Sequence, residues 1–170
     1  MAKKSDFSTE QWRTLRDAPH LVVVAVASAG GSGLFGSLKE AIAPAGAMIE
    51  ALQGDNDLLK DICHKDEMKA AVEEIKEEAK AGDFKSIQAH FRDAAKSWTQ
   101  AAVAILKEKG SAEDVTAYSD FLMKLADRVA NAAKEGGFLG FGGERVSEPE
   151  RALMAELAAA VGRPSGTLQA

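Results

Sequence analysis

The chain has 170 residues, a formal net charge of −5 at pH 7, 46% hydrophobic residues and 4 prolines. This length supports one sizeable core, so we expect a single domain over residues 1–164 and a flexible tail over 165–170. The acidic balance, with no basic stripe, argues against a nucleic-acid partner, and the abundance of Ala, Leu, Lys and Glu favours helices over sheet.

Helix starts are marked by a serine followed three residues later by an acid or glutamine, because the two side chains can satisfy each other's backbone amides. This capping pattern occurs at Ser8, Ser37, Ser111 and Ser147. The first serine predicts a helix to about residue 16. A separate apolar helix over 19–29 should follow, with Pro19 in its first turn.

Six further helices are predicted from the spacing of apolar residues, over 38–53, 56–63, 66–80, 83–108, 112–134 and 148–161. Pro44 and Gly46 should kink or thin the first of them. The apolar stripe of the highly charged segment 66–80 consists of Met68, Ala71, Val72, Ile75 and Ala79. No segment alternates at period two, so we expect a compact all-α bundle of six to eight helices.

Two halves of the chain echo each other around a glycine-rich loop. In each half a small-residue helix runs into paired glycines, an apolar pair follows, and a capping serine opens the next helix. The loop residues are Gly30, Gly31, Leu34 and Phe35 in the first half and Gly136, Gly137, Phe138, Leu139 and Phe141 in the second. We therefore predict two pseudo-repeated helix-loop-helix halves.

These loops allow two interpretations. Their apolar side chains could fold back and plug the ends of the bundle. Alternatively, the two loops could lie together at one pole as an apolar patch that grips a partner protein, a hydrophobic ligand or a membrane surface. Homo-oligomerisation through the same loops is a third hypothesis.

The repeated pattern resembles the TerB-like family of tellurite-resistance and stress proteins. The matching stretches are Ala27-Ser28-Ala29-Gly30 with Glu40, and Ala133-Lys134-Glu135-Gly136 with Glu150. Ala29 stands where the family has an aspartate. The resemblance implies an all-helical stress-response module that is cytoplasmic and works with a protein partner or a membrane-associated complex. It also implies a divalent-cation pair at Glu135 and Glu150.

Catalytic residues are not grouped in any recognisable motif, so we expect a non-enzymatic protein. The alternative is a metal-binding carrier or enzyme, because Asp61, His64 and Glu67 could share a helical face and hold a hydrated cation. Cys63 and His64 are adjacent in a helix and point apart, so they do not form a nucleophile and base.

Residues 21–29 imitate the apolar core of an export signal, but acidic residues occupy the region that should be basic. We expect a buried helix there. The single cysteine, Cys63, suits a reducing compartment, and both observations favour a cytoplasmic location.

Overall fold

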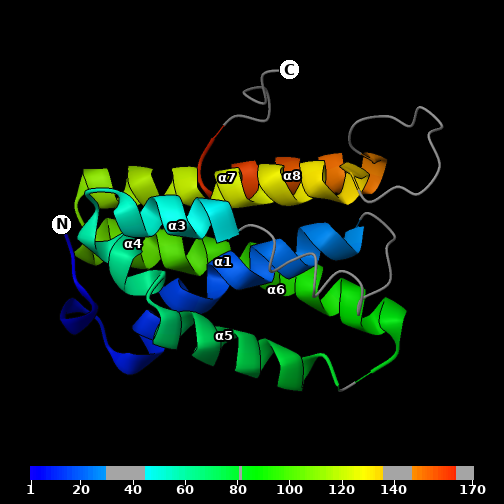
Figure 1. Cartoon of the computed structure of the whole chain (residues 1–170), viewed down its shortest axis with the longest axis horizontal. Coiled ribbons are helices and arrows are strands. Elements are labelled where there is room, and N and C mark those ends of the chain that lie inside the picture. The colour runs from blue at the N-terminus through cyan, green and yellow to red at the C-terminus, as the bar shows by residue number, and fades with distance from the viewer. Residues whose placement is uncertain (30–44, 81, 136–146, 164–170) are drawn as a thin grey trace.

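The computed structural model describes residues 1–29, 45–80, 82–135 and 147–163. These ranges contain a short 3-10 helix at Lys4–Asp6 and seven α-helices: α1 (Thr9–Ala29), α3 (Ala45–Gln53), α4 (Asp57–Ile62), α5 (Lys65–Glu78), α6 (Phe84–Lys109), α7 (Ala112–Glu135) and α8 (Glu148–Ala160). The described ranges contain no strand. The predicted all-α bundle of six to eight helices is confirmed (Figure 1).

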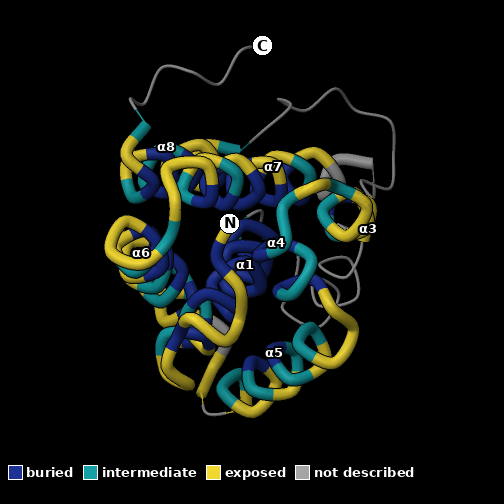
Figure 2. The backbone as a smooth tube through the Cα atoms, turned by 90° about the vertical axis from the view of Figure 1, so that its left-hand side faces the viewer, coloured by how far each residue is buried: buried dark blue, intermediate teal, exposed yellow. Residues whose placement is uncertain are grey.

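Helix α1 is the central element, and the other helices are arranged around it. Every residue from Leu15 to Ser28 is buried, so this stretch has no solvent-facing side. Helices α5, α6, α7 and α8 all pack against it, and Figure 2 shows it as a mainly dark-blue tube inside the bundle. A helix that is buried all round needs no polar face, which explains why residues 21–27 are continuously apolar.

The prediction of separate helices over 9–16 and 19–29 is wrong, because α1 continues through Pro19. Proline has no N–H, so it cannot donate the usual helical hydrogen bond to the carbonyl of Leu15. The fully buried Tyr118 of α7 replaces that bond: its hydroxyl donates to the Leu15 carbonyl at 2.8 Å. A contact between residues far apart in the sequence therefore satisfies the carbonyl that Pro19 leaves free.

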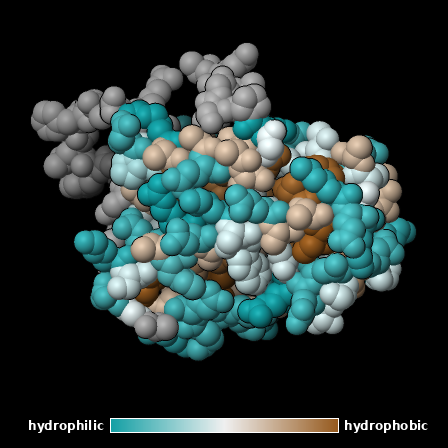
Figure 3. Space-filling model, turned by 180° about the vertical axis from the view of Figure 1, so that it is seen from behind, coloured by the Kyte–Doolittle hydropathy of each residue, from teal (hydrophilic) through white to brown (hydrophobic). Residues whose placement is uncertain are grey.

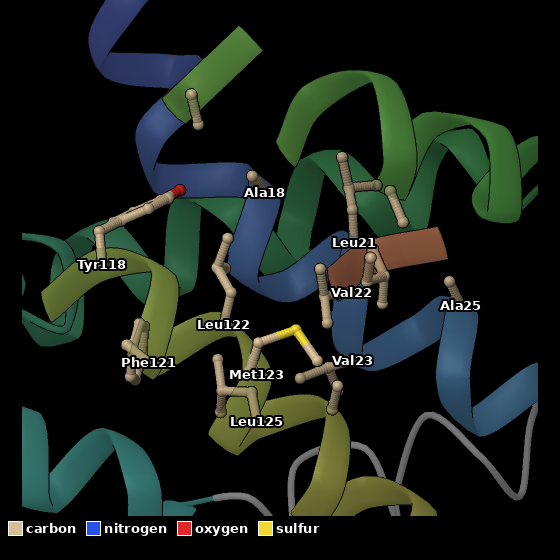
Figure 4. Packing of buried hydrophobic residues seen from close by; sticks show 14 of the residues in the cluster. Ala18, Leu21, Val22, Val23, Ala25, Tyr118, Phe121, Leu122, Met123 and Leu125 are labelled. Atoms are coloured by element: carbon tan, nitrogen blue, oxygen red, sulfur yellow. The ribbon is translucent and has the colours of Figure 1, made fainter. Parts of the chain in front are cut away.

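Apolar packing surrounds this hydrogen bond. Figure 4 shows Val22 and Val23 of α1 on the side where Leu122 and Met123 of α7 lie, with the oxygen of Tyr118 directed at α1. All these side chains belong to one continuous core cluster. These apolar surroundings raise the free-energy cost of leaving the Leu15 carbonyl without a hydrogen-bond donor.

The predicted caps at Ser8, Ser111 and Ser147 are confirmed. Each serine hydroxyl oxygen accepts a hydrogen bond from the backbone N–H three residues later. The distances are 3.2 Å to Gln11 N, 3.1 Å to Asp114 N and 3.4 Å to Glu150 N. The fourth predicted cap, at Ser37, lies outside the described residues. Because capping is a local interaction, it fixes these helix starts close to their predicted positions.

Asp114 has a second role in the fold. Its carboxylate accepts hydrogen bonds from Ala2 N at 2.9 Å and from Asn56 Nδ2 at 3.2 Å. Asn56 is itself the N-cap of α4. One buried acid thus joins the N-terminal segment, the start of α4 and the start of α7.

Several boundaries shift by one or two residues from the prediction, as for α5 at Lys65–Glu78 and α6 at Phe84–Lys109. Of the predicted helix 38–53, the described part is Ala45–Gln53, and Pro44 and the tail 165–170 lie outside the described residues. The loops that define the two halves also lie outside them, so the internal repeat stays a prediction. Within the described ranges no helix combines the length and apolarity needed to cross a bilayer.

The hydrogen bond between Tyr118 and Leu15 can be tested with Tyr118→Phe, which removes only the hydroxyl. We expect the free energy of unfolding to fall by about 1–3 kcal/mol, because the Leu15 carbonyl stays buried without a donor. In a Pro19→Ala background the amide restored at position 19 can donate to that carbonyl. In that background, Tyr118→Phe should lower the free energy of unfolding by at most about half as much as it does in the wild type. Urea unfolding of the four proteins measures both costs, and equal costs would contradict this account.

Candidate functional site

A mainly apolar groove lies between α3 and α5 in the described surface, with a volume of about 620 Å³. We call it the α3–α5 groove. Its walls are the apolar side chains Met48, Ile49 and Leu52 of α3 and Met68 and Val72 of α5. His20 of α1 also contributes to its lining. The volume lies in the range of ligand-binding clefts, which are mostly apolar with a few polar groups.

Exposed apolar side chains are concentrated in this groove. Ile49 is 50% exposed and Leu52 is 37% exposed, and apart from Met1 they are the exposed large hydrophobic residues of the described chain. Figure 3 shows the opposite face of the molecule, where strongly hydrophobic residues form small patches broken up by hydrophilic ones. Large apolar side chains left exposed together in one groove commonly serve recognition.

The orientation of α3 explains this exposure. Ala47 is the one fully buried residue of α3. Glu50, three residues later on the adjoining part of the same face, forms ion pairs with Arg128 of α7 at 2.6 Å and with Lys124. The hydrogen bonds from Lys124 and Arg128 lower the pKa of Glu50. Helix α3 is thus tied to α7 through Glu50 and packs on α4 and α7, while Ile49 and Leu52 remain exposed at the groove.

The predicted apolar stripe of α5 is divided between the core and the groove. Ala71 and Ile75 are buried, in a helix that packs on α1, as predicted for an amphipathic helix. Met68 and Val72 are only half-buried and line the groove. The stripe is therefore wider than the surface that α1 covers.

Polar contacts fix α5 against α1. Glu74 accepts a hydrogen bond from Arg16 Nη2 at 2.7 Å, and its other oxygen lies 2.6 Å from Arg13 Nε. Arg16 also donates to Asp17, at 2.5 and 3.0 Å. Burial raises the pKa of Asp17, and the hydrogen bond from Arg16 opposes that shift. This cluster holds the α5 wall of the groove in place.

Three lysines follow the α5 side of the groove. Lys65, Lys69 and Lys76 are all lining residues, and Glu73 is the one carboxylate among the described lining residues. Lys69 Nζ lies 4.0 Å from Glu73 Oε1. Lys65 and Lys76 make no ion pair within the described ranges. On a protein of net charge −5, this edge of the groove is locally positive.

His20 is 7% exposed, and its Nδ1 lies 3.3 Å from the carbonyl oxygen of Arg16. Burial lowers its pKa from 6.5 to about 4, because the charged imidazolium would lose its hydration there. The charge of Arg16 acts in the same direction, and the hydrogen bond to the Arg16 carbonyl opposes it. His20 is therefore neutral at pH 7.

The alternative cation site at Asp61, His64 and Glu67 is not assembled. Asp61 accepts from the backbone N of Lys4 at 3.2 Å, and His64 caps α5. Glu67 accepts from Trp12 Nε1 at 2.9 Å and pairs with Lys4. Burial acts to raise the pKa of Glu67, but the hydrogen bonds from Lys4 and Trp12 outweigh it, so the pKa is lowered. Within the described ranges no group of three His, Cys, Asp or Glu residues could hold a metal ion.

The Cys63 thiol is not a reactive group in this fold. Its side chain is buried in the core cluster, 1% exposed, beside the end of α4. Burial raises its pKa to about 12, so the nucleophilic thiolate is scarcely populated at neutral pH.

The residues predicted from the two loops cannot be placed. Gly30, Gly31, Leu34, Phe35, Gly136, Gly137, Phe138, Leu139 and Phe141 lie outside the described residues, as does the side chain of Glu135. Glu150 is buried, and its Oε2 accepts hydrogen bonds from Ser147 N at 2.8 Å and Ser147 Oγ at 2.7 Å. Its Oε1 has no hydrogen-bond partner in the described ranges. The cation pair with Glu135 therefore stays a prediction.

Sequence reasoning missed the α3–α5 groove. Met68 and Val72 have the same spacing as the core residues of α5, so the stripe alone does not separate the two roles. The available signal is the charge pattern: Lys65, Lys69 and Lys76 flank those apolar residues on one side of the helix.

No protein-family model, curated protein or solved structure matches this chain.

The buried His20 predicts a pH dependence of stability. Because its pKa is lower in the folded protein than in the unfolded chain, the unfolded chain binds more protons between pH 6.5 and about 4, and stability falls as the pH falls. His20→Leu should remove this contribution. Over that interval the wild type should lose about 3 kcal/mol more than the variant.

Chemical denaturation at several pH values measures this difference. Val24→Ala, a non-titrating change in the same buried helix, serves as the control. It should lower the free energy of unfolding by a similar amount at each pH, so that the dependence of this free energy on pH stays as in the wild type. A wild-type slope in His20→Leu would contradict the assignment.

Proposed function

We propose that the protein is a non-enzymatic binding module whose recognition surface is the α3–α5 groove. The observation that carries this proposal is the exposure of Ile49 and Leu52 within a groove whose other walls are also apolar. Covering these side chains with a partner removes apolar area from water and so favours binding. Met48 and Met68 are flexible enough to fit the shape of such a partner.

The surroundings of the groove support recognition rather than chemistry. Its walls are anchored to the rest of the bundle, since α3 is tied to α7 through Glu50 and α5 is tied to α1 through Glu74. Its charged lining residues are spread along one edge instead of converging on a point. We infer that this arrangement selects a partner by shape and charge.

The cellular part of the proposal rests on the TerB-like resemblance. We infer a stress-response role in the cytoplasm, with a protein partner or a membrane-associated complex. The two Gly/Phe-rich loops are proposed as a second contact surface or a site of homo-oligomerisation. In Figure 1 the C-terminal ends of α1 and α7 and the N-terminal end of α8 lie at the same end of the molecule. These three ends flank the loops, which supports the idea that the loops share one pole.

The groove can be tested with 8-anilinonaphthalene-1-sulfonate, an apolar anionic fluorophore. We expect saturable binding with a fluorescence increase. Ile49→Ser combined with Leu52→Ser should weaken binding about tenfold or more, because each exposed side chain contributes apolar contact worth roughly 1 kcal/mol.

Ala101→Ser combined with Ala104→Ser, at two exposed sites on α6, is the control and should bind like the wild type. Circular dichroism and thermal unfolding should show that all variants remain folded. Undiminished binding by the folded Ile49/Leu52 variant would refute the groove as the recognition surface.

A further inference from the structure

We propose that the partner of the α3–α5 groove is an amphipathic α-helix with a row of carboxylates along one flank of its apolar face. This inference rests on the proposed function of the groove and specifies the chemistry of the partner. It is carried by the combination of an apolar groove between two helices and a lysine row along one of its edges.

The groove has the form that receives a helix. Its walls are two helices, and α5, with 14 residues, extends for about 21 Å. The apolar side chains project from both walls, Ile49 and Leu52 from one side and Met68 and Val72 from the other. A partner helix inserts side chains at spacings of three and four into grooves of this kind, and flexible methionines adapt to them.

The charges are spread along the groove. Lys65, Lys69 and Lys76 are separated by four and seven residues, so they lie on one side of α5 and span about 16 Å. A fatty acid carries one charge at one end and would leave most of this row unpaired. A helix with acidic residues every one or two turns places a carboxylate near each lysine.

Carboxylates of the protein itself do not cancel this row. Glu50 of α3 is engaged by Lys124 and Arg128 of α7, and Glu73 pairs with Lys69, the middle lysine. Lys65 and Lys76 remain without an ion pair in the described ranges. A two-fold contact with a second copy would bring both lysine rows into one interface, where they would repel.

The test uses three synthetic helices of about 18 residues, a length that can be helical in isolation. The first has leucines at helical spacing flanked by glutamates. The second has the same leucines flanked by lysines, and the third keeps the glutamates but scrambles the leucine positions. Fluorescence anisotropy measures binding to the wild type, to Lys65→Glu/Lys76→Glu and to the matched control Lys85→Glu/Lys107→Glu on α6.

We expect the glutamate-flanked helix to bind the wild type at least about tenfold more tightly than the other two peptides at low salt. The preference should shrink as salt is added. Lys65→Glu/Lys76→Glu should reverse the preference between the glutamate-flanked and lysine-flanked helices, and the control variant should keep it. Each variant is first shown to be folded by circular dichroism.

Equal binding of the two leucine-spaced helices, or a preference for the lysine-flanked one, would overturn the proposal. So would oleate binding at the groove without binding of the glutamate-flanked helix, or a dimer that Ile49→Ser/Leu52→Ser dissociates. These outcomes are distinguishable from failure of the proposed function. If the fluorophore binds through Ile49 and Leu52 but the acidic helix does not, the groove is a recognition surface for another partner.

Discussion

Pro19 cannot donate a backbone hydrogen bond to the carbonyl of Leu15, and the hydroxyl of Tyr118 donates one in its place. The rest of the bundle is arranged around the helix that this bond completes. A carbonyl left free in the middle of a buried helix would have no water to accept from, so α7 has to bring a donor to that point. The position of α7 is thereby tied to a single turn of α1. Its apolar residues then meet the continuous apolar run of α1 on the C-terminal side of that turn.

The first half of α1 has a different character, and this difference produces the candidate site. Arg16 and Asp17 are buried there as a pair, and Arg16 reaches Glu74 of α5. Helix α5 is attached to α1 through the apolar pair Ala71 and Ile75, the ionic cluster of Arg16 and Glu74, and the hydrogen bond from Trp12 to Glu67. Helix α3 is instead bound to α7 through the ion pairs of Glu50. The space between α3 and α5 therefore remains as an apolar groove with one positive edge.

Local interactions explain what could be predicted from the sequence. The capping pairs at Ser8, Ser111 and Ser147 act within one helical turn, and the apolar spacing of α6 and α7 is long and regular, so these elements were found close to their true bounds. The break at Pro19 was predicted wrongly because its compensation comes from Tyr118, 103 residues from Leu15. The groove was missed because Met68 and Val72 look like core residues until the width of the α1 contact is known. The glycine-rich loops lie outside the described residues, so those predictions remain as they were.

The burial of Cys63 makes the protein well suited to site-directed spectroscopy. The thiolate is the form of cysteine that attacks alkylating reagents, and Cys63 combines 1% exposure with a pKa raised to about 12. A cysteine introduced on the surface can therefore carry a fluorescent or spin label while the native cysteine stays in place. Paired labels on α3 and α5 would report the separation of the two helices directly, without any replacement in the core.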